Sequence, residues 1–376
     1  MNPAQFDDIR PYKDEEISAA MQRITDSEFF PTLATYVYPN KDIAEVRTLM
    51  RSLRTISEFQ LEVMRCVSEQ IIARSISEFS YAGLEHLDTT KNYLFVSNHR
   101  DIMLDSCLVM YALTQKGFDT AEITFGSNLM SGQLIIDIGK SNKMFRVERG
   151  KSVKELYMIS QHLSEYIRYV ITEKRQSVWI AQRNGRTKDG NDTTDQGIVK
   201  MFCMSMPHDK IKALSQLNMV PIAVSYEWEP CDILKTLELY EFRHEKYIKK
   251  PGEDLNSILT GIVQNKGKMH IEFCKPITEN DLLRFADNTN NEYHKNVAAL
   301  IDERIRAGYR LSANNYIAHD IRYGELRYAA HYTEEQKQEF IAHLDELNSY
   351  SEWDLDTLCD IFLGIYSNPV RNKGEL

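Results

Sequence analysis

Short apolar runs that alternate with helical patterns restrict the fold of this chain more than any other feature. Between the runs, apolar residues recur every three or four positions, most clearly over 153–170. Strands that alternate with helices at this spacing predict an α/β domain with a mostly parallel central sheet flanked by helices. The strand-like runs are rich in Val, Ile, Tyr and Phe. They are YLFVS (93–97), EITFG (122–126), SVWIA (177–181), MVPIAVSY (219–226) and KMHIEF (268–273).

The two ends of the chain have a more helical character. Over 43–76 the apolar residues fall mostly at three- and four-residue spacing, and the preceding stretch, FFPTLATYVYP (29–39), is apolar and aromatic. After Pro276 the pattern is helical again. We therefore expect three parts, namely an N-terminal helical region (1–90), an α/β domain (91–280) and a helical C-terminal extension (281–376).

Net charge and cysteine usage narrow the functional classes. The 376-residue chain has a formal net charge of -10. It is therefore expected to be a poor general binder of nucleic acid, because that affinity comes from cationic contacts with phosphate. The six cysteines form no CxxC pair and match no zinc-site spacing. We expect reduced thiols, no bound metal and no resident cofactor.

The sequence also bears on location. The segment MNPAQFDDIRPYKDEE at the N-terminus lacks the apolar core of a signal peptide. No stretch approaches the ~18 consecutive apolar residues of a transmembrane helix. We therefore expect a cytoplasmic protein. If the substrate is a lipid, the protein has to meet it as a peripheral contact at the inner face of the cytoplasmic membrane, through a local basic or apolar patch.

The segment SNHRDIMLDS (97–106) leads from a strand into an apolar helix and contains the main catalytic candidate. A strand that ends in Ser-Asn-His places His99 at the carboxyl edge of the sheet, where α/β folds build their sites. A histidine bonded to a carboxylate is a competent general base near neutral pH. Asp105 and Asp101 are both close enough in sequence to supply that carboxylate. The alternative is a structural histidine that caps the helix.

A basic island in this acidic chain is a candidate anion site. It is the segment KSNKMFRVERGKSVK (140–154), in which Arg146 and Arg149 lie on or beside a short apolar run. Paired guanidinium groups suit a phosphate, because each can form bidentate hydrogen bonds. The alternative is an ordinary solvated surface.

Two more segments complete the set. WIAQRNGRTKDG (179–190) is predicted to be a strand followed by a polar turn, where Gly185 allows close approach to a ligand and Arg186 follows it. NMVPIAVSY (218–226) is predicted to be a strand, in which Pro221 indicates a bulge or an edge position. Taken singly, the first could equally be a plain turn and the second a plain core strand.

The order of these segments resembles a known family. SNHRDIMLDS, MFRVERG, AQRNGRTKD and VPIAVSY are similar, in this order, to the four motif blocks of the glycerolipid acyltransferase superfamily, which includes glycerol-3-phosphate and 1-acylglycerol-3-phosphate acyltransferases. The resemblance covers about residues 91–280 and is greatest to the large soluble acyltransferases of the Bacteroidetes type. It implies that His99 is the catalytic base. It also implies that blocks two and three bind the acceptor, through Arg146, Arg149, Asn184, Gly185 and Arg186.

Two features depart from the family pattern. Five residues separate His99 from Asp105, where the family has four; at ~100° per residue on an ideal helix, the carboxylate would face another side. A non-helical residue in the turn, or Asp101 in that role, would restore the pair. The third block lacks the family's Glu, because either Asn184 or Arg183 stands at its position. That Glu is usually assigned to acceptor binding, so the exact acceptor stays open.

The resemblance implies an O-acyltransferase of phospholipid synthesis. It would move a fatty acyl group from a thioester donor, either acyl-coenzyme A or acyl carrier protein, to the free hydroxyl of a lysophosphatidate-type acceptor. The altered third block leaves two alternatives. One is transfer to a phosphate-free lyso-aminolipid, and the other is a non-catalytic lipid-binding protein of the same fold.

Overall fold

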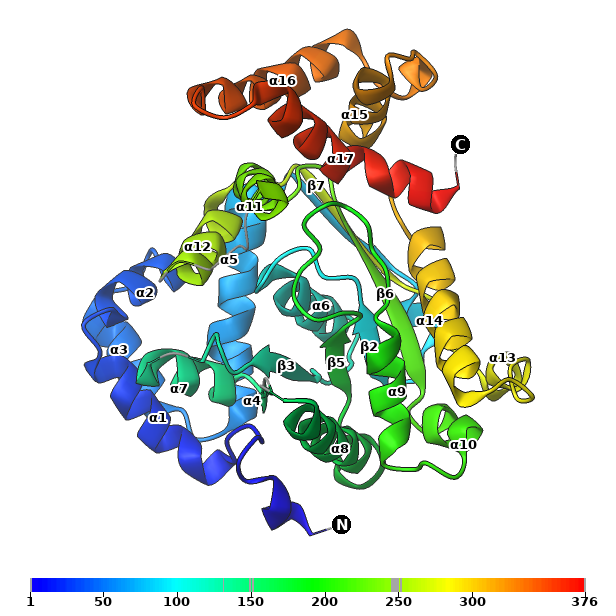
Figure 1. Cartoon of the computed structure of the whole chain (residues 1–376). Coiled ribbons are helices and arrows are strands. Elements are labelled where there is room, and N and C mark those ends of the chain that lie inside the picture. The colour runs from blue at the N-terminus through cyan, green and yellow to red at the C-terminus, as the bar shows by residue number, and fades with distance from the viewer. Residues whose placement is uncertain are drawn as a thin grey trace.

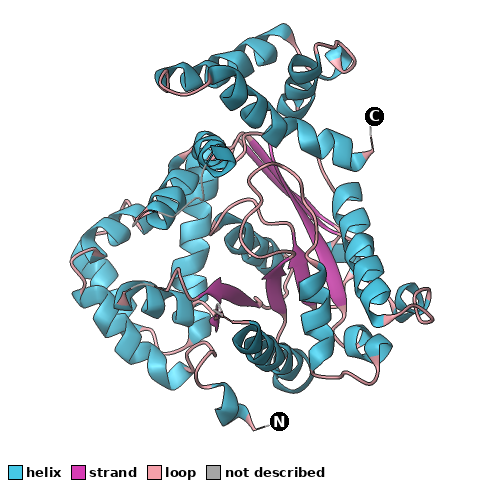
Figure 2. Cartoon of the chain, viewed as in Figure 1, coloured by secondary structure: helices cyan, strands magenta, loops and turns pink. Residues whose placement is uncertain are grey.

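A single sheet organises the molecule. The computed structural model describes residues 2–130, 132–148, 150, 152–244, 250 and 252–374. Within these ranges, seven strands form one sheet in the order β1-β7-β6-β2-β5-β3-β4 (Figure 1; Figure 2). Neighbouring strands pair parallel except β6 and β7, which are antiparallel. The expected α/β fold with a mostly parallel sheet and flanking helices is confirmed.

The strands match the apolar runs of the sequence, and two more strands join them at the edges. Strand β2 lies in the middle of the sheet and all four of its residues are buried, as is typical of a central parallel strand. The strands are β1 (Glu78–Ala82), β2 (Leu94–Ser97), β3 (Glu122–Gly126), β4 (Met144–Val147), β5 (Val178–Ala181), β6 (Met219–Tyr226) and β7 (Lys268–Phe273).

Helices cover both faces of the sheet. One face carries α8 (Val153–Tyr169, continued by a π-helix over Val170–Lys174), α9 (Gln196–Met204), α10 (Lys210–Ser215), α13 (Glu279–Leu283) and α14 (Asn290–Ala307). The other carries α5 (Arg65–Ser75) and α6 (Leu104–Gln115). Successive side chains of β2 serve both cores, since Leu94 and Val96 pack on the first face and Phe95 on the second.

The N-terminal residues form a helical layer with a core of its own. It comprises a short 3-10 helix (Pro3–Phe6), α1 (Asp14–Asp26), α2 (Phe30–Val37), α3 (Ile43–Ser52), α4 (Ile56–Phe59) and a π-helix (Gln60–Met64). Leu134 and Ile138 of α7 (Gln133–Ser141) pack against this core. The buried Asp137 of α7 accepts hydrogen bonds from Arg23 and Tyr12, which ties the layer to the edge of the sheet.

The C-terminal residues form a second helical layer. It contains α15 (Ala313–Tyr323), α16 (Glu334–Leu344), α17 (Leu355–Lys373) and two 3-10 helices, Ala329–His331 and Asp345–Ser349. Another 3-10 helix, Leu84–His86, follows β1. Figure 1 shows this layer stacked at one end of the molecule. It packs on α11 (Asp232–His244), which precedes α12 (Glu253–Val263). Within the described ranges, no helix combines the length and apolar character needed to cross a bilayer.

The sheet draws on segments outside the expected α/β domain. Residues 78–82 lie in the region 1–90, which the sequence predicts to be helical, yet they form strand β1, paired with β7. Four of the five β1 residues are only half-buried, so the apolar run that marks a central strand is missing. Helix α14, from the expected C-terminal extension 281–376, packs on the sheet as well.

Two local expectations need correction. The helical pattern over 43–76 is interrupted, because α3 ends at Ser52 and Thr55 begins α4 with a capping box that includes Glu58.

Pro221 is not in an edge strand, since β6 lies between β7 and β2. Its carbonyl accepts from Cys274, just beyond the end of β7. The antiparallel pairing of β6 with β7 begins only at Ile222, so the N–H group that Pro221 lacks is not needed there.

One ion pair across the C-terminal layer generates a pH prediction. Burial alone would lower the pKa of His343, but hydrogen bonds to Asp232 (2.8 Å) and Glu346 (2.9 Å) raise it to about 9. The unfolded value is about 6.5. Because the folded pKa is the higher one, the stabilisation is complete below pH ~6.5 and is lost as the pH rises through about 9.

We therefore expect His343→Gln to lower the free energy of unfolding by on the order of 2 kcal/mol at pH 6 and by much less at pH 9.5. Urea denaturation at both pH values measures this difference. The exposed His208, changed to Gln, is the control and should show no such pH dependence. Equal losses at the two pH values in His343→Gln would contradict the ion-pair assignment.

Candidate active site

The turn after β2 brings His99 onto the carboxylate of Asp105. The Nδ1 atom of His99 lies 2.9 Å from Oδ2 of Asp105, and the Asp105 side chain is fully buried. Residues 98–103 are not helical, and α6 begins only at Leu104. The fifth intervening residue is taken up in this non-helical turn, so the angular argument from an ideal helix does not apply.

Asp105 is the centre of the turn. Besides His99, its Oδ2 atom accepts from the backbone N–H groups of Arg100 (2.6 Å) and Asp101 (2.9 Å). Its Oδ1 atom accepts from the Tyr226 hydroxyl at 2.7 Å, and burial together with the Asp105 charge raises the pKa of that tyrosine. Both oxygens of this buried carboxylate are thus hydrogen-bonded, as buried polar groups generally are. Asp105 fixes the ring orientation of His99, and as an acceptor it favours the tautomer with the proton on Nδ1.

Asp101 has a different place. Its Oδ1 atom accepts from the N–H groups of Met103 (2.9 Å) and Leu104 (2.8 Å), so it caps the start of α6. Burial raises the pKa of Asp101, and the nearby Asp105 carboxylate adds to this. Gly261 of α12 packs directly on this carboxylate, since a Cβ there would lie 2.3 Å from Oδ2. The structure thus pairs His99 with Asp105 and uses Asp101 as a cap.

The second ring nitrogen of His99 makes no bond to the turn. The Nε2 atom has no hydrogen-bond partner within the described part of the chain, and the side chain is 14% exposed. The centroid of the Trp179 ring, on β5, lies 5.7 Å from that of the imidazole in an edge-on arrangement, which limits how the imidazole can rotate. With Nδ1–H bonded to Asp105, Nε2 carries the lone pair of a general base.

Of the third-block residues, Arg186 approaches the turn. It follows the exposed Asn184 and Gly185, and Gly185 has φ +74°. The Nη2 atom of Arg186 donates to Ser257 of α12 at 3.0 Å. Its Nη1 atom is buried without a partner among the described residues. Ser257 lies one helical turn before Gly261, and Gly261 packs on the carboxylate of Asp101, so α12 connects the guanidinium with the start of α6.

The second-block arginines are farther away. Arg146 lies in β4, which is separated from β2 by β3 and β5, or roughly 14 Å at the usual strand spacing. Its side chain is 43% exposed and pairs with Glu148 at 2.6 Å. It is at the same carboxyl edge as His99, but the two are not in contact. Arg149 lies outside the described residues.

Sequence reasoning missed a buried charge cluster behind the turn. The Arg100 guanidinium bonds to Asp192 (2.6 Å) and Glu229 (3.2 Å). Lys235 bonds to Glu229 (2.6 Å) and to the Arg100 carbonyl (2.7 Å). All four residues are buried, at 5% exposure or less. Burial would raise the pKa of Asp192, but Arg100 and several hydrogen bonds hold it below the ordinary value. Two cations thus balance two anions.

The same cluster holds both neighbours of His99. Asp192 also accepts from the side chain of Asn98 (3.0 Å) and from the hydroxyl of Tyr309 (2.5 Å). The carbonyl of His99 itself accepts from the N–H of Thr187 at 2.6 Å. These partners are dozens of residues apart in sequence. The sequence carries no signal for them, because Asp192 lies in a polar loop and Glu229 lies between Glu227 and Asp232.

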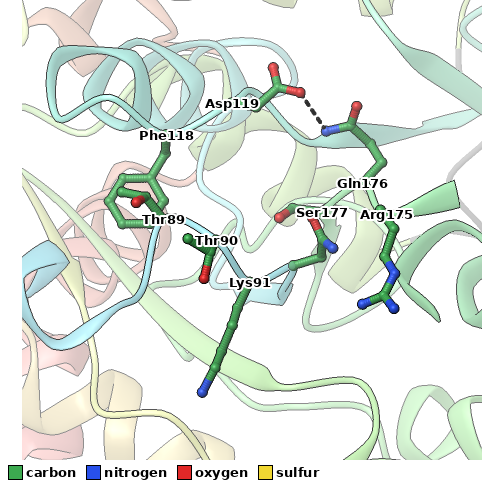
Figure 3. A pocket seen from close by; sticks show the side chains of 9 residues that line it. Thr89, Thr90, Lys91, Phe118, Asp119, Arg175, Gln176 and Ser177 are labelled. Carbon is green, nitrogen blue, oxygen red and sulfur yellow. Dashed lines mark hydrogen bonds between the residues drawn. The ribbon is translucent and has the colours of Figure 1, made fainter. Parts of the chain in front are cut away.

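Two cavities of the described part of the chain lie away from His99. One of about 440 Å³ is at the amino ends of β2, β3 and β5, whereas His99 follows the carboxyl end of β2. Figure 3 shows the side chains that line it and the Gln176–Asp119 hydrogen bond. A second, of about 230 Å³, runs beside α6 and includes Cys107 and Met110 in its lining. His99 lines neither of them.

Comparison with known proteins shows a distant structural likeness. No protein-family model matches the sequence, and no curated protein matches it. The crystal structure of the 1-acyl-sn-glycerophosphate (LPA) acyltransferase PlsC from Thermotoga maritima is similar with a TM-score of 0.34 and 12% sequence identity. The match covers 76% of this chain and 94% of that chain.

The four bonds of Asp105 generate a stability prediction. In Asp105→Asn the side chain keeps one acceptor oxygen and places an NH2 group against a donor. At least one buried donor loses its partner, so we expect the free energy of unfolding to fall by about 1–3 kcal/mol.

Urea denaturation near neutral pH measures this change. The control is Asp195→Asn, at an exposed helix N-cap that bonds the N–H of Gly197, because Asn caps a helix about as well as Asp. A variant at position 105 as stable as the Asp195→Asn control would show that the four bonds matter little.

Proposed function

We propose that this protein is an O-acyltransferase that transfers a fatty acyl group from a thioester to a lipid hydroxyl, with His99 as the general base. The observation that carries the proposal is the His99–Asp105 hydrogen bond of 2.9 Å at the carboxyl edge of the sheet, with Nε2 left available. It is supported by the four sequence segments, which resemble acyltransferase motif blocks in the expected order.

The proposed step needs no covalent enzyme intermediate. Nε2 of His99 takes the proton of the acceptor hydroxyl while the hydroxyl oxygen attacks the thioester carbonyl. The tetrahedral intermediate then collapses, the C–S bond breaks, and the imidazolium returns its proton to the leaving thiolate. The products are an ester and a free thiol. Asp105 stabilises the imidazolium while it holds the proton.

The oxyanion of the intermediate needs hydrogen-bond donors. The N–H groups of Arg100 and Asp101 are bonded to Asp105, and those of Met103 and Leu104 to Asp101. Within this turn, two N–H groups have no partner among the described residues, namely that of His99 and that of Ile102, which is closer to the start of α6. We propose the N–H of Ile102 as one donor to the oxyanion.

For the acceptor we propose a lysophosphatidate-type lipid. The buried Nη1 of Arg186 has at most the weakly accepting Cys231 thiol beside it. It supports an anionic group at this site, because a phosphate would satisfy this buried donor far better than a thiol does. Arg146 would contribute at longer range from β4, and Arg149, Asn184 and Gly185 remain part of the proposed acceptor site. A phosphate-free lyso-aminolipid is the alternative acceptor, since the third block lacks its Glu.

We also propose a peripheral contact with the inner face of the cytoplasmic membrane. Helix α12 exposes an apolar ridge of Leu255, Leu259 and Val263, while Ser257 and Gly261 on its opposite side contact Arg186 and Asp101. Helices α2 and α12 both pack on α5 and lie on the same side of the molecule in Figure 1. The segment 29–39, which includes α2, adds the exposed Phe29. Helix α12 would then contact the lipid surface on one side and Arg186 and Asp101 on the other.

We expect His99→Ala to lower kcat for acceptor-dependent release of thiol from an acyl thioester by about 10²–10⁴-fold, because the general base is lost. The assay uses acyl-coenzyme A or acyl carrier protein thioester with lysophosphatidate, and in parallel with a phosphate-free lyso-aminolipid. The exposed His208, changed to Ala, is the matched control and should leave turnover unchanged.

The outcomes separate the candidate functions. Turnover in His99→Ala equal to that of the His208→Ala control would disprove the assignment of the base. Transfer to the phosphate-free acceptor alone would favour the lyso-aminolipid alternative. Binding of lysolipid without any thiol release from either donor would favour a non-catalytic lipid-binding protein.

The membrane contact is tested by flotation with vesicles that contain anionic phospholipid. We expect the double variant Leu255→Glu, Leu259→Glu to reduce the bound fraction at least ~10-fold, because each apolar side chain contributes about 1.5–3 kcal/mol when buried. Leu326→Glu, at an exposed leucine of the C-terminal layer, is the control. If the double variant and the control float alike, α12 does not contact lipid.

A further inference from the structure

Helix α17 reaches the two segments that anchor the His99 turn. One is the loop after β6, which carries Glu229, and the other is the loop between β5 and α9, which carries Thr187 and Asp192. Figure 1 shows α17 at the junction between the C-terminal layer and the rest of the molecule. The contacts of this helix therefore bear on the site although its residues lie far from His99 in sequence.

The first contact is made by the buried hydroxyl of Tyr366. It accepts from the backbone N–H of Glu229 at 3.1 Å and donates to Asp232 at 2.5 Å. The carboxylate of Glu229 in turn bonds to the guanidinium of Arg100 and to Lys235. Glu229 therefore links Tyr366 to Arg100, the residue that follows His99.

The second contact is made with the loop after β5. Asn368 donates to the carbonyl of Asp189 at 2.7 Å. The next residue, Gly190, has φ +75°, and a Cβ there would lie 2.2 Å from the carbonyl oxygen of Ile365. The loop backbone thus packs directly against α17, with no room for a side chain. The same loop bonds to the His99 carbonyl through Thr187.

We propose that α17 is a positioning element of the active site, which holds the His99 turn in its productive geometry through Tyr366 and Asn368. This inference rests on the proposed function, because it assigns the C-terminal layer a part in the same reaction. The physical reason is that Asn98, His99 and Arg100 are each held by one of the two segments that α17 contacts. A small shift of Nε2 relative to a bound hydroxyl slows proton transfer more than it weakens binding.

The test removes single contacts of α17. We expect Tyr366→Phe and Asn368→Ala each to lower kcat by roughly 10-fold, within the ~100-fold that a misplacement of 1 Å can cost, with KM changed less than threefold. The matched control is Tyr332→Phe in the same layer. It removes a hydroxyl that bonds to the carboxylate of Asp320 at 2.9 Å.

A second measurement does not depend on turnover. The Cε1–H signal of His99 is recorded by NMR on histidine-labelled protein, assigned by its loss in His99→Gln. We expect this signal to move or broaden in Tyr366→Phe and Asn368→Ala, and to stay at the wild-type position in Tyr332→Phe. Thermal melting of all variants shows that they are folded at the assay temperature.

The outcomes are distinguishable from those that test the function. Wild-type kcat and an unchanged His99 signal in both α17 variants would overturn the positioning role. An equal effect of Tyr332→Phe would also overturn it, since general destabilisation would then explain the loss. If wild-type protein transferred no acyl group to any acceptor, the proposed function would fail, and the His99 signal alone would still decide whether α17 positions the turn.

Discussion

Four hydrogen bonds on one buried carboxylate determine the shape of the proposed site. Asp105 accepts from the His99 ring, from two successive backbone N–H groups and from Tyr226. The backbone donors require residues 99–101 to curl around the first turn of α6, and that curl is what brings His99 back over the sheet edge. The ring orientation of His99 and the non-helical turn therefore both depend on the Asp105 carboxylate, whose four hydrogen bonds support one another.

The buried charge cluster lies behind this turn. Arg100, Lys235, Asp192 and Glu229 are all buried, and each has a partner of opposite sign. Such a cluster adds little stability compared with apolar packing, but breaking it leaves an uncompensated buried charge. It therefore fixes one arrangement of the surrounding loops. Both helical layers are attached to the central domain by the same type of contact, Arg23–Asp137 in the N-terminal layer and His343–Asp232 in the C-terminal one.

The sequence by itself determined the fold class, because apolar periodicity is a local property that burial in a sheet or against a helix imposes on the chain. It located the central strands within one residue, and it singled out His99 and Asp105, since strand ends at the carboxyl edge are where α/β sites form. The edge strand β1 was not visible, because a half-buried strand lacks a continuous apolar run. The break between α3 and α4 was also not visible, because it is marked by one capping residue, Thr55, within an otherwise helical pattern.

Only the tertiary structure decided which carboxylate meets His99 and which caps α6, because that choice depends on where the helix begins. It also separated the arginines, with Arg186 near the turn and Arg146 three strands away in β4. The pairing of Arg100 with Asp192 and Glu229 joins residues 92 and 129 positions apart. No local pattern encodes such pairs. They form because the folded chain brings these charges together out of water, where each one needs a partner of opposite sign.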